Sequence, residues 1–310
     1  MFDLGSCLAS PMFPIKFYFW RPGPFLSHCK VPRCIEKPPL FTAARKKSSL
    51  ERRGDKIWHH EVMEGAFAVE NKVMKRIAIS QSNYIPWKGY FDFINSVDEF
   101  VLYDDVQFTR RDWRNRNLIK TSAGPKWLTI PVRVKGRFTQ KINETAIDDK
   151  AWPSRHWRSI ALNYARAAHF HDYGDEIKRL YVDGRESLLS EVNFRFIIGI
   201  CGLLGIRTPI RWSADFDLQG DRSERLVNVC LQAGADVYVS GPAAKDYLDN
   251  ALFVRAGIRV VWMDYERYPE YRQLYGSFQH SVSIIDLLLN EGPRAPAFMK
   301  SFGQQTPHLQ

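Results

Sequence analysis

The sequence contains few cysteines, and they are not spaced for metal binding. Only 5 of its 310 residues are cysteine, and three of the five lie within the first 34 residues. No Cys-x-x-Cys pair and no cluster of cysteine with histidine is present, so nothing in the pattern supports a structural zinc. Low cysteine use is typical of a reducing compartment, and we therefore predict a cytoplasmic protein without a metal site.

Long apolar runs and the common nucleophile motifs are also missing. The longest apolar run, residues 196–206, contains three glycines and is too short to cross a bilayer, so we predict no membrane span. A Gly-x-Ser-x-Gly turn and a Cys–His pair are both absent, which removes support for a covalent acyl-enzyme. His169 and His171 have no third metal ligand nearby in the sequence. No motif identifies a cofactor, so the cofactor is unknown at this stage.

The positive charge of the chain is unevenly distributed. The net charge is +10, and residues 1–73 hold 12 Lys and Arg against 7 Asp and Glu. The rest of the chain holds 32 against 27, so it is only mildly basic. A mild excess of positive charge fits an anionic small substrate as well as a nucleic acid.

Residues 1–73 differ in pattern from the rest of the chain. Seven of the 17 prolines lie between positions 11 and 39, and the segment shows neither strand nor helix periodicity. Its prolines interrupt the apolar core that a secretory signal needs, and its aromatic residues are too frequent for typical disorder. We expect this segment to lie outside the fold, either as a disordered tail or as an extended start, with the natural protein beginning at Met74 or at Met63.

Regular alternation begins at Lys75. Apolar runs predict strands over residues 75–80, 99–104, 127–134, 237–239 and 258–263, and spacings of three and four predict helices over 90–96, 154–167, 172–181, 186–204, 221–233 and 283–289. Strands and helices alternate at both ends, with a helical section between them. Residues 74–310 are therefore predicted to form one α/β domain with a mostly parallel, Rossmann-like sheet and a helical insertion.

Polar and aromatic residues fill the loop after the first predicted strand, residues 80–90 (the first loop). In open α/β sheets, ligands bind outside the carboxyl ends of the strands, where such loops lie. Amides that donate and accept hydrogen bonds alternate here with rings that can stack. The predicted substrate-binding residues are Gln81, Asn83, Tyr84 and Trp87. The alternative is a turn shaped by proline and glycine, with its aromatic side chains packed inward.

Two adjacent carboxylates, Asp104 and Asp105, open the loop after the second predicted strand, residues 104–117 (the second loop). Neighbouring negative charges repel each other and are costly to bury, which makes them poor structural choices at a strand end. We therefore predict that Asp104 or Asp105 is a catalytic general base or binds a substrate hydroxyl group.

Four arginines follow these carboxylates, with two asparagines, a glutamine and a tryptophan. Such side chains can bind a polyhydroxyl compound, clamp a phosphate and stack on a flat ring. The predicted substrate-binding residues are Gln107, Arg111, Asp112, Trp113, Asn115, Arg116 and Asn117, and Arg114 is a further candidate anion contact. The alternative is a solvated basic helix start in which Asp112 pairs with Arg116 four residues later.

A weaker phosphate signal follows the predicted strand at 237–239, in residues 240–245 (the third loop). Ser240 supplies a hydroxyl, Gly241 allows close backbone approach, and Lys245 supplies a positive charge. A helix starting near Pro242 would direct its amides at an anion, although an ordinary strand-to-helix turn explains the same residues. Because parallel strands end at one edge of a sheet, we expect the three loops to line a common cavity.

Together, the three loops resemble the WbqC-like family of bacteria. The resemblance covers residues 75–292 and is carried by residues 81–91, 104–108, 111–117, 240–248 and 283–290. It implies an α/β domain with a role in surface-polysaccharide and O-antigen biosynthesis. Ser80 and Ser82 depart from the family, in which this loop typically reads His-Gln-Pro-Asn. Residues 86–90 also look faintly like the HxGH loop of nucleotidyltransferases, but Trp87 and Tyr90 replace both histidines.

We therefore expect a group-transfer enzyme that acts on a sugar or nucleotide-sugar intermediate. One of the two aspartates would accept a proton from the attacking hydroxyl or amine, and arginines of the second loop would bind phosphate. A non-catalytic nucleic-acid-binding protein, built on the basic and aromatic second loop, is the main alternative. A scaffold protein without activity is a third possibility and is consistent with Ser80 in place of a histidine.

Overall fold

A computed structural model of the chain describes residues 73–304. The prediction that residues 1–73 lie outside the fold concerns a segment that, apart from Val73, falls outside the described residues.

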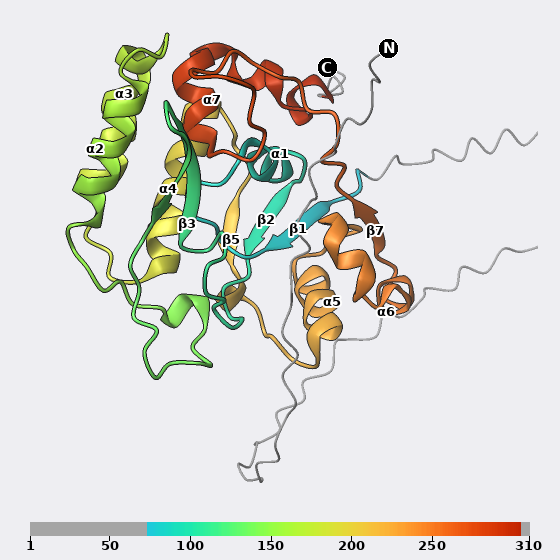
Figure 1. Cartoon of the computed structure of the whole chain (residues 1–310). Coiled ribbons are helices and arrows are strands. Elements are labelled where there is room, and N and C mark those ends of the chain that lie inside the picture. Colours follow the sequence, from blue (N-terminus) through green and yellow to red (C-terminus); the bar gives the residue numbers. More distant parts are fainter. Residues whose placement is uncertain (1–72, 305–310) are drawn as a thin grey trace, which may run out of the picture. The chain divides into compact units, whose positions relative to one another are not determined.

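A five-stranded parallel sheet forms the centre of the domain. Its strand order is β5-β2-β1-β6-β7, and every neighbouring pair is parallel (Figure 1). The strands are β1 (Arg76–Ser80), β2 (Glu99–Leu102), β5 (Ile210–Trp212), β6 (Val237–Ser240) and β7 (Arg259–Trp262). The predicted α/β fold with a parallel sheet is confirmed.

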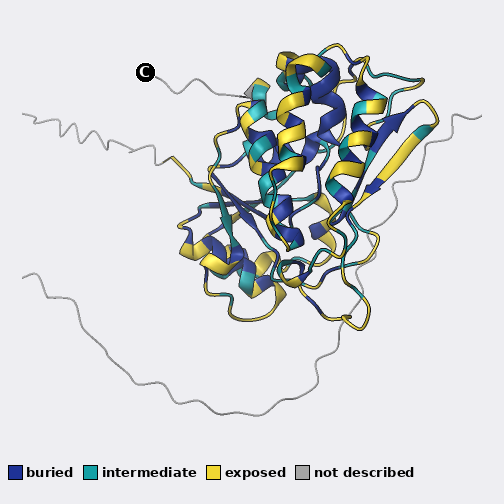
Figure 2. Cartoon of the chain, turned by 90° about the vertical axis from the view of Figure 1, so that its left-hand side faces the viewer, coloured by how far each residue is buried: buried dark blue, intermediate teal, exposed yellow. Residues whose placement is uncertain are grey.

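Side chains alternate between the two faces of this sheet along each strand, and helices cover both faces. Ile77 and Ile79 of β1 pack in a core with α5 (Arg222–Gln232) and α6 (Asn250–Arg255), whereas Ala78 belongs to the core on the other face. That second core contains the buried apolar residues of α1 (Lys88–Asn95), α4 (Leu189–Leu204) and α7 (Ile284–Glu291). The central strands β2, β1 and β6 are largely buried because both of their faces are covered, whereas β5 and β7 at the two edges are mostly half-buried (Figure 2).

The predicted helical insertion lies between β2 and β5. It contains α2 (Trp152–Tyr164), α3 (Phe170–Val182) and α4, and α2 packs along α3 (Figure 1). Short 3-10 helices complete the domain at η1 (Ile142–Glu144), η2 (Ser213–Asp215), η3 (Pro242–Asp246), η4 (Gly292–Phe298) and η5 (Ser301–Gln304).

An antiparallel hairpin also belongs to this insertion. It pairs β3 (Arg116–Thr121) with β4 (Gly124–Thr129) and forms a separate two-stranded sheet. The sequence predicted a strand over 127–134 but none over 116–121. The prediction missed β3 because its arginine, asparagine and lysine interrupt the alternation of apolar and polar residues that marks a strand. Asn117 and Lys120 are buried there with hydrogen-bond partners.

The strand order reverses next to β1. From β1 the chain passes to β2 and then to β5 on one side, whereas β6 and β7 lie on the other side. The first and third loops therefore leave neighbouring strands at the point where ligands bind in open α/β sheets. The second loop leaves β2 at the same edge.

Candidate functional site

Arg114 of the second loop binds the first loop directly. Its guanidinium donates one hydrogen bond to the Asn83 side-chain oxygen and another to that of Gln81. The carboxylate of Asp112 lies 3.9 Å from the same guanidinium. The structure thus brings together two loops that are separated by about thirty positions in the sequence.

Asp104 lies beside this contact and has one unused oxygen. Its Oδ1 accepts a hydrogen bond of 2.8 Å from the backbone N–H of Ser82. Its Oδ2 is buried and has no hydrogen-bond partner among residues 73–304, and the residue is only 1% exposed. Burial raises the pKa of Asp104, although hydrogen bonds from Ser82 and the charge of Arg114 act in the opposite direction.

Asn193 of α4 joins the same group of side chains. Its Nδ2 donates to the Ser82 hydroxyl at 3.0 Å and to the Arg114 carbonyl at 2.9 Å, and its Oδ1 is buried without a partner in the described part of the chain. Sequence reasoning missed this residue. An asparagine within the apolar stripe of a predicted helix was the available signal, because buried polar side chains need partners. We call Gln81, Ser82, Asn83, Asp104, Arg114 and Asn193 the sheet-edge cluster.

Asp105 has a different environment from its neighbour. Its Oδ2 accepts a hydrogen bond from the Ser213 hydroxyl at 2.6 Å, and its Oδ1 accepts one from Asn143 at 3.1 Å. The ammonium group of Lys141 lies 3.5 Å from Oδ1. Both oxygens of Asp105 are therefore occupied by protein groups, and the side chain connects the second loop to η1 and η2.

The aromatic residues of the first loop are packed against the protein. Tyr84 is fully buried, and its hydroxyl is hydrogen-bonded with His156 and Tyr181 at 2.9 Å each, so its ring is not open to a ligand. Trp87 is half-buried and makes edge contacts with two tyrosine rings. A Cβ at Gly89 would lie 2.3 Å from the Trp87 ring, so the indole requires glycine at that position.

Asn117 supports the backbone of the first loop. Its Nδ2 donates to the carbonyls of Tyr84 and Ile85, at 3.0 Å in each case, and the residue is 1% exposed. Ile85 has a φ of 36°, an uncommon value for a β-branched residue. Asn117 was predicted to bind substrate, and the structure places it behind the loop, where it stabilises a strained turn.

The third loop differs from the prediction in its helix. Residues Pro242–Asp246 form a five-residue 3-10 helix, which offers no extended helix terminus to an anion. Ser240 is buried, Gly241 is half-buried, and exposed Lys245 has its ammonium group 5.7 Å from the centre of the Trp262 ring. Burial raises the pKa of Tyr247, two residues beyond this loop, and the charges of Arg222 and Arg114 act in the opposite direction.

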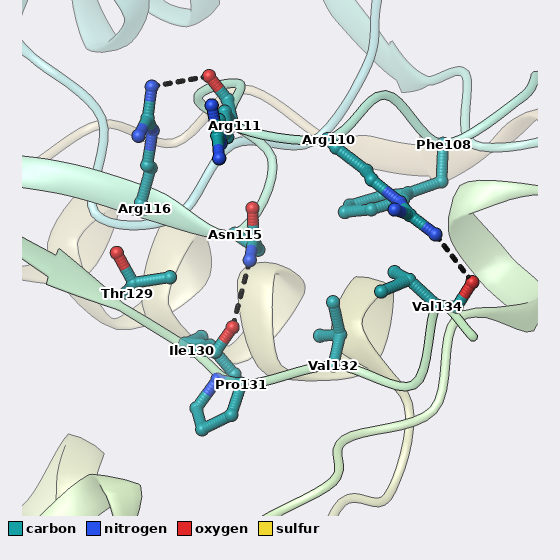
Figure 3. Close-up of a pocket in the computed structure, with 10 residues that line it drawn as sticks. All are labelled: Phe108, Arg110, Arg111, Asn115, Arg116, Thr129, Ile130, Pro131, Val132 and Val134. Carbon is teal, nitrogen blue, oxygen red and sulfur yellow. Dashed lines mark hydrogen bonds between the residues drawn. The ribbon is translucent and has the colours of Figure 1, made fainter.

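Three residues of the predicted set line a separate pocket. Arg111, Asn115 and Arg116 contribute to a cavity of about 210 Å³ between the second loop and the segment that begins at the end of β4 (Figure 3). We call it the arginine pocket, because Arg110 lines it as well. Its remaining lining residues are Phe108, Thr129, Ile130, Pro131, Val132 and Val134. The first and third loops do not line this pocket.

The other predicted residues of the second loop are held by local contacts. Exposed Gln107 donates a hydrogen bond to the Phe138 carbonyl at 2.6 Å. Asp112 accepts one from the Thr109 hydroxyl at 2.6 Å, and the Trp113 ring packs on the Trp127 ring with centres 5.2 Å apart. The predicted residues thus divide between the sheet-edge cluster, the arginine pocket and local structural contacts.

The described residues include no group of three or more His, Cys, Asp and Glu side chains arranged to hold a metal ion. Within the same residues, no helix is both long enough and apolar enough to cross a membrane.

Comparison with known proteins identifies a family for the chain. Residues 81–298 match the WbqC-like protein family. A protein of Mycobacterium tuberculosis (strain ATCC 25618 / H37Rv), described as uncharacterized protein Rv1507c, is 52% identical over 227 residues, which are 73% of this chain and 98% of that protein. No solved structure matches the chain. The chain belongs to the WbqC-like protein family, and the resemblance of its loops is confirmed.

Proposed function

We propose that this WbqC-like protein is a group-transfer enzyme that acts on a sugar or nucleotide-sugar intermediate of surface-polysaccharide synthesis. Its reaction centre is the sheet-edge cluster, and Asp104 is the general base. The family resemblance supports the polysaccharide context, and the low cysteine content supports a cytoplasmic location.

The unused buried oxygen of Asp104 is the observation that carries this proposal. A buried acceptor that lacks a partner costs free energy, so most buried carboxylates in structural roles have both oxygens occupied. Asp105, the adjacent residue, shows that arrangement. Asp104 instead leaves one oxygen for a group that residues 73–304 do not supply, next to the strand reversal where ligands bind.

The chemistry follows from the protonation state of this carboxylate. A general base works best when its pKa approaches the working pH, and burial raises the pKa of Asp104 in that direction. In the transfer step, an acceptor hydroxyl or amine gives its proton to Asp104 while its oxygen or nitrogen bonds to the transferred group. The bond from that group to its leaving group breaks, and the leaving group departs with the electron pair.

Arg114 is suited to stabilise the negative charge that develops on the leaving group. Its two terminal nitrogens are held by Gln81 and Asn83, so the guanidinium is fixed before a ligand arrives. Its Nε is buried and has no partner among the described residues. A preorganised cation of this kind stabilises charge that develops in the transition state without having to reorganise.

A panel of compounds tests this function. Nucleotide sugars and sugar phosphates are screened by the melting temperature of the full chain, and compounds that raise it are incubated with alcohols and amines and followed by phosphorus NMR. We expect at least one phosphorylated sugar to bind and to be consumed with the appearance of a new leaving-group resonance. Tight binding of single-stranded nucleic acid with a steep salt dependence, and no binding of any phosphorylated sugar, would contradict the proposal.

A further inference from the structure

We propose that the arginine pocket is a binding site for a compact sugar phosphate. The pocket lies between the second loop and the segment that begins at the end of β4, and the role of Asp104 in the proposed function is not needed for its argument. Four features of the pocket support this assignment: its charge, its unsatisfied polar atoms, its backbone and its apolar wall.

The first feature is positive charge that no carboxylate of residues 73–304 neutralises. Arg110, Arg111 and Arg116 all line the cavity, and none of its lining residues in the described part of the chain is acidic. None of the three arginines forms an ion pair with a carboxylate within residues 73–304. Like charges that share a small cavity repel each other, and an anion bound between them removes the repulsion. Planar guanidinium groups match the oxygens of a phosphate particularly well.

The second feature is a pair of buried polar atoms without partners. Asn115 is 7% exposed, and its Nδ2 donates to the Ile130 carbonyl at 2.8 Å. Its Oδ1 and the Nε of Arg116 are buried without hydrogen-bond partners in the described residues. Figure 3 shows the Asn115 oxygen on the side of the pocket where Arg111 and Arg116 lie. A ligand that carries both a hydroxyl donor and a phosphate acceptor would satisfy the two atoms.

The third feature is the backbone at Arg111. This residue has a φ of 58°, a left-handed conformation that arginine rarely adopts. The turn directs the Arg111 carbonyl toward Arg116, whose guanidinium donates a hydrogen bond to it. Strained backbone of this kind is concentrated at binding sites. Here it holds two positive side chains at the same end of the pocket, as Figure 3 shows.

The fourth feature is the combination of a small volume and an apolar wall. A cavity of about 210 Å³ is smaller than the roughly 300–1,000 Å³ of sites for drug-sized ligands, so a whole nucleotide sugar does not fit inside it. Phe108, Val132 and Val134 supply an apolar surface away from Arg111 and Arg116, as Figure 3 shows. The apolar face of a sugar ring fits that surface, while its hydroxyl groups and phosphate face the polar end.

Calorimetric titration of the full chain with glucose 1-phosphate tests the assignment, with glucose and inorganic phosphate as separate probes. We expect glucose 1-phosphate to bind more tightly than inorganic phosphate, and glucose alone not to bind. Arg111→Asn keeps a residue that tolerates a positive φ, and Arg116→Gln removes the charge next to Asn115. Each substitution should weaken the binding of glucose 1-phosphate by about tenfold or more.

Arg133→Gln is the matched control. Arg133 lies between two residues of the apolar wall, but its side chain is exposed and pairs with Asp148 instead of lining the pocket. Arg133→Gln changes the net charge by the same amount as the test variants, and it should leave the binding of glucose 1-phosphate unchanged. Equal loss of binding in all three variants would mean that only general positive charge attracts the ligand. Unchanged binding in properly folded Arg111→Asn and Arg116→Gln, judged by their melting temperatures, would also overturn the proposal.

Discussion

Two adjacent aspartates, Asp104 and Asp105, have different environments, and this contrast is the reason why Asp104 is assigned as the general base. Asp105 is satisfied by Ser213, Asn143 and Lys141, whereas only one oxygen of Asp104 has a hydrogen-bond partner among residues 73–304. The sequence indicated that two neighbouring carboxylates were unusual, but it could not tell them apart. Their partners come from segments that are between 22 and 108 positions away, and only the fold decides which residues meet.

Substitution of Asp105 or of Asp104 by asparagine should change the stability of the protein by different amounts. Asp105→Asn removes the ion pair with Lys141 and leaves one oxygen to serve both Ser213 and Asn143, so we expect a loss of about 1–2 kcal/mol in the free energy of unfolding. Burial raises the pKa of Asp104 above its unfolded value, so its ionisation weakens folding as the pH rises through the folded pKa.

Asp104→Asn removes the cost of ionising a buried carboxyl group, so the free energy of unfolding at pH 7 should be unchanged or higher. Urea unfolding of the two variants and the wild type measures the difference. A larger loss for Asp104→Asn than for Asp105→Asn would mean that Asp104 is mainly a structural anchor of the first loop.

Ser82 adjusts the acidity of Asp104. Hydrogen bonds from Ser82 lower the pKa of this carboxyl against the effect of burial. The proline that is typical of the family at this position has neither an N–H nor a hydroxyl to donate. Ser82→Ala keeps the backbone donor and loses the hydroxyl, so the pKa of Asp104 should rise. The acidic limb of the pH–rate profile should shift to higher pH, and a profile that does not move would show that Asp104 is not the titrating base.

The contacts between elements decide how the first loop is held. Tyr84 connects this loop to α2 through His156 and to α3 through Tyr181. Asn117 of β3 holds the carbonyls of Tyr84 and Ile85 from the other side. The sequence predicted α2 and α3 from their apolar spacing, but it did not predict β3, so the support of the loop by the hairpin was not visible.

His156 should make the packing of α2 sensitive to acid. Burial lowers the pKa of His156 to about 4, below its usual value of 6.5. A base with a depressed pKa contributes stability above its unfolded pKa, and this contribution is lost as the pH falls through 6.5 toward 4. The loss amounts to about 3 kcal/mol when it is complete. His156→Gln should reduce this dependence, as measured by urea unfolding at pH 7 and pH 4.5, and an equal pH dependence in the variant would contradict the assignment.

Asn117→Ala should destabilise the fold by about 2–4 kcal/mol. The substitution removes two buried hydrogen bonds and leaves the carbonyls of Tyr84 and Ile85 without these donors. Asn228→Ala is the control, because its single side-chain bond to Gln219 is exposed and its loss should cost far less. Thermal unfolding of the two variants makes the comparison, and equal melting temperatures would show that β3 does not support the first loop.

For the whole molecule, apolar patterns in the sequence predicted the architecture better than they predicted the site. Strands β1, β2, β6 and β7 are short apolar runs followed by polar loops, and that pattern was enough to predict a parallel sheet. The third loop was predicted to start a helix but forms a five-residue 3-10 helix. Asn193 lies 111 positions from Ser82 and joins the sheet-edge cluster only because the fold brings α4 beside the first loop.

In the proposed reaction, Asp104 accepts the proton of the attacking group. The rate of consumption of a phosphorylated sugar by Asp104→Asn, compared with that by Asp105→Asn and the wild type, tests it most directly. Removal of a general base costs roughly 100-fold to 10,000-fold in rate, so we predict such a loss in Asp104→Asn with ligand binding retained. Asp105→Asn should keep most of the wild-type rate. A folded Asp104→Asn variant that consumes the sugar at the wild-type rate would contradict the account.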